Sequence, residues 1–239
     1  MKIMVNGCSV SRGPGSWPYV IKQRIGCELV NLSQAGAGNT YICDATIDEL
    51  SKRKYDLVMI MWADHRRYDL KVKNINDFTD TIYTSKFQKT CNDWPEKIVY
   101  PQNDQDLVDD NWVFGCGYLN TKDPSIVGLF DSYYQHTNLE SQYFSSYMKI
   151  IALQSFLKTT NQPYIFCSVR KFTNMQKITN LYNLLDFDRI YNDVTAHDLA
   201  GELDDWEPDR LHPGPRAHTK YADHLVEFSQ RKGLFNEHH

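Results

Sequence analysis

The sequence predicts a doubly wound α/β fold, in which helices cover both faces of a mostly parallel sheet. Three short apolar runs with strand character, at residues 2–6, 27–32 and 55–62, alternate with segments of helical periodicity. The third run is continuously apolar, as is typical of parallel strands that are buried on both faces. Strands that alternate with helices in this way indicate a parallel sheet.

The first half of the chain has local signals at the ends of its expected helices. Residues 14–25 are expected to form a helix, with Pro14 near its start and Gly26 as its stop. A turn of small residues at 33–40 precedes a second helix, which is expected over 40–53. Strand, helix, strand and helix therefore follow one another before the third apolar run.

The same alternation returns in the C-terminal half. Apolar residues at helical spacing occupy 139–158, and a fourth strand is expected at 163–169. A weaker helix is expected over 175–185 and a loop rich in acidic residues over 198–209. The closing helix is expected over 216–232.

Between these halves, from about residue 69 to residue 136, the periodicity is lost and Asn, Asp, Tyr and Trp accumulate. A structureless loop of this length is unusual in a compact domain, so short helices or a small subdomain are expected. We therefore expect one domain over 1–239 with an insertion or cap at about 69–136. The insertion's aromatic side chains either pack onto the sheet or line a cleft and stack on sugar rings; they are Trp94, Tyr100, Trp112, Tyr118, Tyr133 and Tyr134.

Composition excludes several classes of function. The chain has 239 residues, 41% of them hydrophobic, and no apolar run approaches the roughly 18 residues that a membrane helix requires. A net charge of −4 gives no general attraction to nucleic acid. The N-terminal residues lack the pattern of a secretory signal, which predicts a cytoplasmic location, in the host if the protein is viral. The six cysteines are scattered without metal-ligand spacing, so no metal or cofactor is expected.

Two separate stretches contain residues suited to nucleophilic catalysis. Ser9 follows the first strand directly after Asn6-Gly7, so it is expected at the carboxyl edge of the sheet, where open α/β folds bind ligands. Near the C-terminus, Asp209 stands three residues before His212. An aspartate so placed can hold the Nδ1–H of the imidazole and leave Nε2 free as a base. The structural alternative for Ser9 is a strand-end hydroxyl that bonds a loop amide.

These blocks resemble those of the SGNH hydrolases, also called GDSL-type esterases. That family has its nucleophilic serine in a Gly-Asp-Ser turn after the first strand, a glycine after the second strand, and Asp-x-x-His near the C-terminus. The matching blocks here are Gly7-Cys8-Ser9, the turn that ends at Gly36, and Asp209-Arg-Leu-His212. The resemblance spans about residues 1–67 and 160–232, and it implies a flavodoxin-like three-layer α/β/α sandwich.

The resemblance also implies roles for these residues. Ser9 attacks an acyl carbon, His212 takes the proton of the serine, and Asp209 orients His212. The backbone N–H groups of Ser9 and Gly36 bind the developing oxyanion, while Gly36 has the alternative role of a turn glycine before the second helix. The implied activity is that of an esterase or deacylase without a cofactor, acting on an ester of a small metabolite or a glycan.

The third family block, which supplies an Asn, is missing. The third strand is followed here by Ala63 and then Asp64-His65-Arg66, and Ala63 has no side-chain donor. Asn39, His65 or Arg66 could supply that donor. Alternatively, Asp64 binds a substrate hydroxyl while Arg66 pairs with a carboxylate or with Asp64, or the loop is simply solvated and internally paired. With this replacement the chain resembles SGNH-like proteins of tailed phages.

Two further functions stay open on the sequence. The same triad can transfer the acyl group to an acceptor other than water, which would make the protein an acyltransferase. The missing Asn and the large polar insertion also fit an SGNH-fold binding or structural protein with impaired catalysis. Cys8 stands where the family has Asp, a change that we expect to cost little activity because that carboxylate is usually structural.

Overall fold

A computed structural model describes residues 1–71, 78–83, 112–115, 119–121, 124–172 and 180–235. Within these residues the central sheet has four strands that are all parallel. Their spatial order is β2 (Glu28–Asn31), β1 (Lys2–Asn6), β3 (Leu57–Trp62) and β8 (Tyr164–Ser168). From β1 the chain first adds β2 on one side and then crosses over to add β3 on the other side of β1. The topological switch point therefore lies between β1 and β3, which is the position where flavodoxin-like sheets bind ligands. The predicted parallel α/β fold is confirmed.

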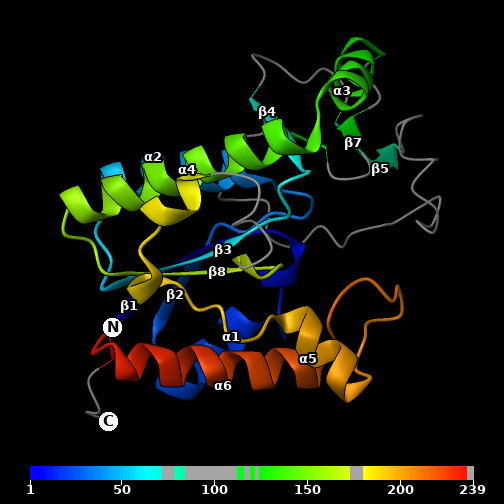
Figure 1. Cartoon of the computed structure of the whole chain (residues 1–239). Coiled ribbons are helices and arrows are strands. Elements are labelled where there is room, and N and C mark those ends of the chain that lie inside the picture. Colours follow the sequence, from blue (N-terminus) through cyan, green and yellow to red (C-terminus); the bar gives the residue numbers. More distant parts are fainter. Residues whose placement is uncertain (72–77, 84–111, 116–118, 122–123, 173–179, 236–239) are drawn as a thin grey trace.

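The helices form a layer on each face of this sheet (Figure 1). One layer contains α2 (Asn39–Lys52) and α4 (Leu139–Thr159), which pack against each other. The opposite layer contains α1 (Trp17–Ile25), α5 (Ala196–Leu203) and α6 (Pro215–Arg231). The structure is therefore the three-layer α/β/α sandwich that the sequence predicts.

The middle strands are buried because helices cover both of their faces. All six residues of β3 are buried, so the continuous apolar run of the sequence corresponds to a strand with no solvent-facing side. On the helical layers the apolar side chains face inward, with Trp17 of α1 and Tyr221 of α6 in edge-to-face contact. Gly26 ends α1 with a φ of 63°, a left-handed conformation that glycine adopts without steric cost.

Three helix predictions need correction. The first helix begins at Trp17 rather than at Pro14, because Gly13 and Gly15 both have positive φ and prevent an earlier start. The acid-rich segment expected to be a loop contains α5, which a capping box between Thr195 and Asp198 initiates. Of the weak helix expected at 175–185, residues 175–179 lie outside the described part, and Asn180–Leu184 form a 3-10 helix.

The described part of the insertion is an antiparallel sheet with one helix. Its strands, in spatial order, are β4 (Tyr68–Lys71), β6 (Trp112–Gly115), β7 (Leu119–Thr121) and β5 (Phe78–Tyr83). Helix α3 (Pro124–His136) follows and leads to α4 (Figure 1). Trp112 packs edge-to-face on Tyr41 of α2, and Tyr133 contacts the buried Tyr134. The contacts of Trp112 and Tyr134 agree with packing, whereas Tyr133 also lines a small hollow, and Trp94, Tyr100 and Tyr118 lie outside the described residues.

The cysteines of the described residues do not form disulfides. Cys8, Cys27, Cys43 and Cys167 are all free and buried. Burial raises the pKa of both Cys43 and Cys167 to about 12, so these two thiols stay protonated and unreactive at neutral pH. Among the described helices, none combines the length and the apolar character that crossing a membrane would require.

Candidate active site

Ser9 lies at the carboxyl end of β1, in a turn that two preceding residues hold in place. The side chain of Asn6 accepts a hydrogen bond from the backbone N–H of Gly7 and donates two to α2. A Cβ atom on Gly7 would lie 2.7 Å from Ser11 Oγ and 3.1 Å from the carbonyl oxygen of Met61. Glycine is therefore required here, because the chain passes against β3 before it turns into the short 3-10 helix that begins at Ser9.

The loop that contains His212 is closed by backbone hydrogen bonds at both ends. The N–H of Glu207 donates to the carbonyl of His212 at 2.8 Å, and the N–H of Gly214 donates to the carbonyl of Asp205 at 2.7 Å. Within the loop, Asp209 Oδ1 accepts from the backbone N–H of His212 at 3.0 Å. Arg210 has a φ of 57°, so the chain turns sharply between the aspartate and the histidine. The result is a fixed turn that faces the end of β1.

The three predicted catalytic side chains are in direct contact. His212 Nε2 lies 2.8 Å from Ser9 Oγ, across a separation of 203 residues in the chain. His212 Nδ1 lies 2.5 Å from Asp209 Oδ2. Both distances are those of hydrogen bonds, and their order is that of a nucleophile, a base and an orienting acid.

Asp209 is held in its charged form. Burial by itself would raise its pKa, but hydrogen bonds from the backbone N–H of Leu211, the ring of His212 and the backbone N–H of His212 outweigh burial and hold the pKa below its usual value. The carboxylate therefore remains ionised at neutral pH. An ionised Asp209 favours the Nδ1–H tautomer of His212 and stabilises the imidazolium that forms during proton transfer.

Ser9 and Gly36 follow the carboxyl ends of two neighbouring strands, β1 and β2. Among the described residues, no acceptor is found for the backbone N–H of Ser9 or of Gly36. Gly36 has a φ of 83°, a left-handed conformation that orients the peptide of this turn and favours glycine. An oxyanion is stabilised by N–H donors that have no other acceptor. That the N–H groups of Ser9 and Gly36 bind an oxyanion stays a prediction.

Asn39 is positioned differently from a free donor. Its two amide hydrogens are engaged by the carbonyl of Ala63 at 3.3 Å and by Ser146 Oγ at 2.7 Å. Its side-chain oxygen accepts from the backbone N–H of Ala63 at 2.8 Å. Asn39 is buried, and it joins the start of α2 to the end of β3 and to α4. An oxyanion role for Asn39 would require it to leave these partners.

The residues after β3 form a charged cluster of their own. Asp64 accepts three hydrogen bonds from Arg66: from the backbone N–H at 3.0 Å, from Nε at 2.9 Å and from Nη2 at 2.8 Å. Of the sequence alternatives, the structure contains the pairing of Arg66 with Asp64. His65 is buried and stacks on Tyr143 at 3.5 Å between ring centroids. Burial lowers the pKa of His65 to about 4, so its ring is neutral at pH 7.

Two residues that the sequence reasoning missed belong to this region. Arg170 follows β8, and its Nε donates to Asp64 Oδ2 at 2.5 Å. Asp69 of β4 accepts from the backbone N–H groups of Gly38 at 2.8 Å and Tyr41 at 2.9 Å. Neither residue has a motif signal, since both depend on which strands and loops are neighbours in space.

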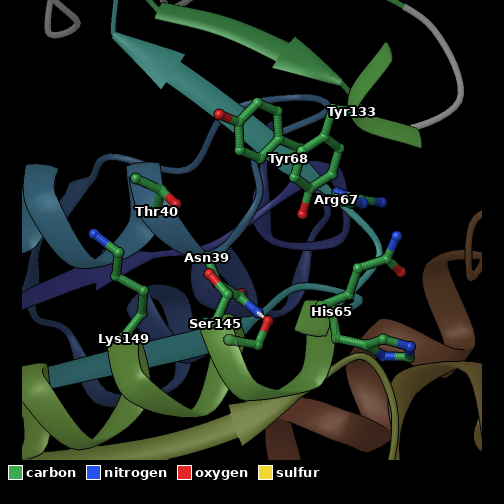
Figure 2. Close-up of a pocket in the computed structure, with 10 residues that line it drawn as sticks. Asn39, Thr40, His65, Arg67, Tyr68, Tyr133, Ser145 and Lys149 are labelled. Carbon is green, nitrogen blue, oxygen red and sulfur yellow. Dashed lines mark hydrogen bonds between the residues drawn. The ribbon is translucent and has the colours of Figure 1, made fainter. Parts of the chain in front are cut away.

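A small polar hollow lies beside this region, between α2, α4 and the insertion (Figure 2). Tyr68 and Tyr133 stack over it with ring centroids 3.8 Å apart, and Lys149 and Thr40 lie at its other side. Its volume is about 10 Å³, which is the space of about one water molecule. No triad residue lines this hollow, and it is too small for an ester substrate.

The described residues contain no group of three or more His, Cys, Asp or Glu side chains that could hold a metal ion. Ser9, His212 and Asp209 are joined in this order by the contacts that nucleophilic and acid–base chemistry requires.

Comparison with solved structures places the fold among esterases. The psychrotrophic esterase EstA from Pseudoalteromonas sp., in a structure inhibited by monoethylphosphonate, matches over 98% of this chain and 99% of its own, with 13% identity and a TM-score of 0.54. A member of the lipolytic protein G-D-S-L family from Veillonella parvula matches over 96% and 98%, with 10% identity and a TM-score of 0.47. No protein-family model and no curated protein sequence matches the chain. The likeness to EstA shows a shared overall fold over nearly the whole length of both chains, in agreement with the SGNH hydrolase-type α/β fold that the resemblance implies.

Proposed function

We propose that the protein is a serine ester hydrolase whose nucleophile is Ser9. The observation that carries this proposal is the continuous chain of contacts from Ser9 Oγ to His212 Nε2 at 2.8 Å and from His212 Nδ1 to Asp209 Oδ2 at 2.5 Å. The position of Ser9 at the switch point of a parallel sheet supports it, because substrates reach that edge in open α/β folds.

The reaction has two steps. In the first, His212 Nε2 takes the proton of Ser9 as Oγ attacks the ester carbonyl, and the same proton then passes to the leaving alcohol as the C–O bond breaks. In the second step, His212 takes a proton from water, the resulting hydroxide attacks the acyl-serine, and Ser9 Oγ recovers a proton from His212 as the acid leaves. Asp209 stays ionised in both steps.

The oxyanion of both steps is proposed to lie between the backbone N–H groups of Ser9 and Gly36. One such donor is worth on the order of 3 kcal/mol in the transition state. The substrate is proposed to be an acyl ester of a small molecule or a glycan.

Hydrolysis of 4-nitrophenyl acetate by the purified protein tests this function. Ser9→Ala should lower kcat to the uncatalysed background, while Ser51→Ala, at an exposed serine near the end of α2, should leave kcat unchanged. Turnover that survives Ser9→Ala would contradict the proposal.

Because EstA is inhibited by a phosphonate, a fluorophosphonate probe gives a second measurement, and it should label the wild type but not Ser9→Ala. A folded wild-type protein that the probe does not label would favour a binding or structural role.

Acyl transfer by the same residues is separated from hydrolysis by the products. If water is the acceptor, acetate should account for all the 4-nitrophenol released when a sugar or glycerol is added. A matching amount of acetylated sugar or glycerol would identify a transferase instead.

A further inference from the structure

Asp64 is an anchor for two arginines at the carboxyl edge of the sheet. Its side chain is only 12% exposed, although it follows the end of β3. Burial by itself would raise the pKa of Asp64, but the hydrogen bonds and the charge of Arg66 hold the pKa far below its usual value. The carboxylate is therefore ionised in the folded protein.

Arg66 alone already compensates this buried charge. It donates through its backbone N–H and through two side-chain nitrogens, which is the bidentate arrangement typical of a strong arginine–carboxylate pair. A second guanidinium, that of Arg170, then donates its Nε to Asp64 Oδ2. The four donors fill the acceptor positions of the carboxylate, which leaves none for a substrate hydroxyl.

The Nη1 and Nη2 groups of Arg170 are not used in the contact with Asp64. Its side chain is 60% exposed, and no hydrogen bond from Nη1 or Nη2 is found among the described residues. The contact with Asp64 fixes Nε and therefore the orientation of the planar group. Two parallel N–H donors on a fixed guanidinium match the two oxygens of a carboxylate or a phosphate.

The strand register places Arg170 at the same edge of the sheet as the triad. In the parallel sheet, β1 pairs with β3 and β3 pairs with β8, with Trp62 opposite Ser168. Arg170 thus extends from the same edge as Ser9, with only the loop after β3 between them. The half-buried His197 of α5 supports this placement, since partial burial and then the charges of His212 and Arg170 lower its pKa.

The charge balance at this edge is positive although the whole chain has a net charge of −4. Arg66, Arg170 and Arg67, which donates to the carbonyl of Ala37, supply three positive charges against the two ionised carboxylates of Asp64 and Asp209. The nearby Asp69 does not balance them fully at pH 7, because burial raises its pKa to about 7. A local excess of positive charge concentrates anions at the site.

We propose that Arg170 binds an anionic group, a carboxylate or a phosphate, which the ester substrate carries beside its scissile bond. This inference rests on the proposed esterase function and narrows its substrate class to anionic esters. The anionic group belongs to either the acyl part or the alcohol part, and two pairs of probe esters distinguish these sources.

Turnover of charged and neutral probes by wild type and Arg170→Gln gives the first measurement. The alcohol-side pair is 4-acetoxybenzoate and 4-acetoxybenzamide, and the acyl-side pair is 4-nitrophenyl hemisuccinate and 4-nitrophenyl butanoate. Arg170→Gln should lower kcat/KM for the charged member of one pair about tenfold or more, as expected for a lost charge-assisted hydrogen bond. It should change the neutral members less than twofold. The pair that responds identifies the part of the substrate with the anion.

The matched control is Arg24→Gln. Arg24 also pairs with a carboxylate, that of Asp223, but it lies near the end of α1, away from the carboxyl edge. This variant removes the same charge and should leave all four kcat/KM values within twofold. Equal losses for charged and neutral esters in Arg170→Gln would show a merely structural role and overturn the inference.

Binding measurements keep this inference separate from the esterase proposal. In the Ser9→Ala background, calorimetry should show that Arg170→Gln weakens the binding of 4-hydroxybenzoate or of monomethyl succinate about tenfold, but not that of 4-hydroxybenzamide or methyl butanoate. If wild type hydrolyses none of the four esters, the esterase proposal fails while binding still decides the anion site. If neither binding nor turnover depends on the carboxylate, the anion site is wrong and the esterase proposal stands on the neutral esters.

Discussion

The carboxylate of Asp69 occupies the space that a side chain on Gly38 would need. A Cβ atom on Gly38 would lie 2.8 Å from Asp69 Oδ1, and the backbone N–H of Gly38 donates to that oxygen at 2.8 Å. The second carboxylate oxygen accepts from Tyr41 in the first turn of α2. Because Asp69 belongs to β4, this contact joins the insertion to the turn that contains Gly36.

Asp69 should make the protein less stable as the pH rises from about 4 to about 7. Burial raises its pKa to about 7, more than the hydrogen bonds from Tyr41 and Gly38 lower it. Between about pH 4 and pH 7 the folded state thus holds a proton that the unfolded state has released. The free energy of unfolding falls over this window, by at most about 1.4 kcal/mol per pH unit.

Urea unfolding of wild type and Asp69→Asn at pH 5.5 and 7.5 measures this effect, because asparagine does not titrate. The free energy of unfolding of wild type minus that of the variant should be smaller at pH 7.5 than at pH 5.5. A difference that is independent of pH, or that grows with pH, would show that Asp69 is ionised throughout.

His218 should have the opposite effect at acidic pH. It is buried on α6, and burial, followed by the charges of His197 and His212, lowers its pKa to about 4. Between about pH 6.5 and pH 4 the unfolded state binds a proton that the folded state does not. Its contribution to stability is therefore lost as the pH falls through this window, by at most about 1.4 kcal/mol per unit. His218→Gln should unfold with a smaller loss of stability between pH 6.5 and pH 4.5 than wild type, and an unchanged loss would contradict the shift.

Gly36→Ala should reduce activity, and Gly26→Ala is its matched control. Both glycines have positive φ, 83° and 63°, so alanine strains both turns and costs stability on the order of 1 kcal/mol. Only Gly36 lies in the turn proposed to form the oxyanion hole, whereas Gly26 ends α1. We expect kcat on 4-nitrophenyl acetate to fall at least about tenfold in Gly36→Ala and to stay within twofold in Gly26→Ala. Equal activities would remove Gly36 from the oxyanion hole.

The sequence predicted those parts of the site that local patterns encode. Ser9 follows an apolar strand and a glycine turn, and Asp209 precedes His212 by one turn of chain, so each half is visible in a short window. The contact between Ser9 and His212 spans 203 residues, and the expectation that they meet came from the resemblance to a family rather than from spacing. The parallel sheet was predictable for a related reason, since β3 is a continuous apolar run with no solvent-facing residue.

The missed residues depend on contacts that no local pattern encodes. Arg170 reaches Asp64 because β8 pairs with β3, and strand order cannot be read from either segment alone. Asp69 binds Tyr41 in the first turn of α2 from 28 residues further along the chain. The start of α5, unlike these two contacts, has a local signal, because Thr195 and Asp198 form a capping box that is visible in the sequence. The helix was therefore predictable, and the density of acidic residues led to the wrong prediction of a loop.

Arg210 provides a test of the turn that positions the base. Its φ of 57° places a side-chain-bearing residue in the left-handed region, which costs about 1 kcal/mol relative to glycine. Its side chain contributes little in return, because its contact with Asp204 at 3.4 Å joins two highly exposed groups. Arg210→Gly should therefore be more stable than Arg210→Ala by about 1 kcal/mol, since both lose the side chain and only glycine relieves the strain. Thermal unfolding monitored by circular dichroism measures the difference, and kcat of the glycine variant shows whether the turn still presents His212. Equal stability of the two variants would mean that the turn does not hold residue 210 in this conformation.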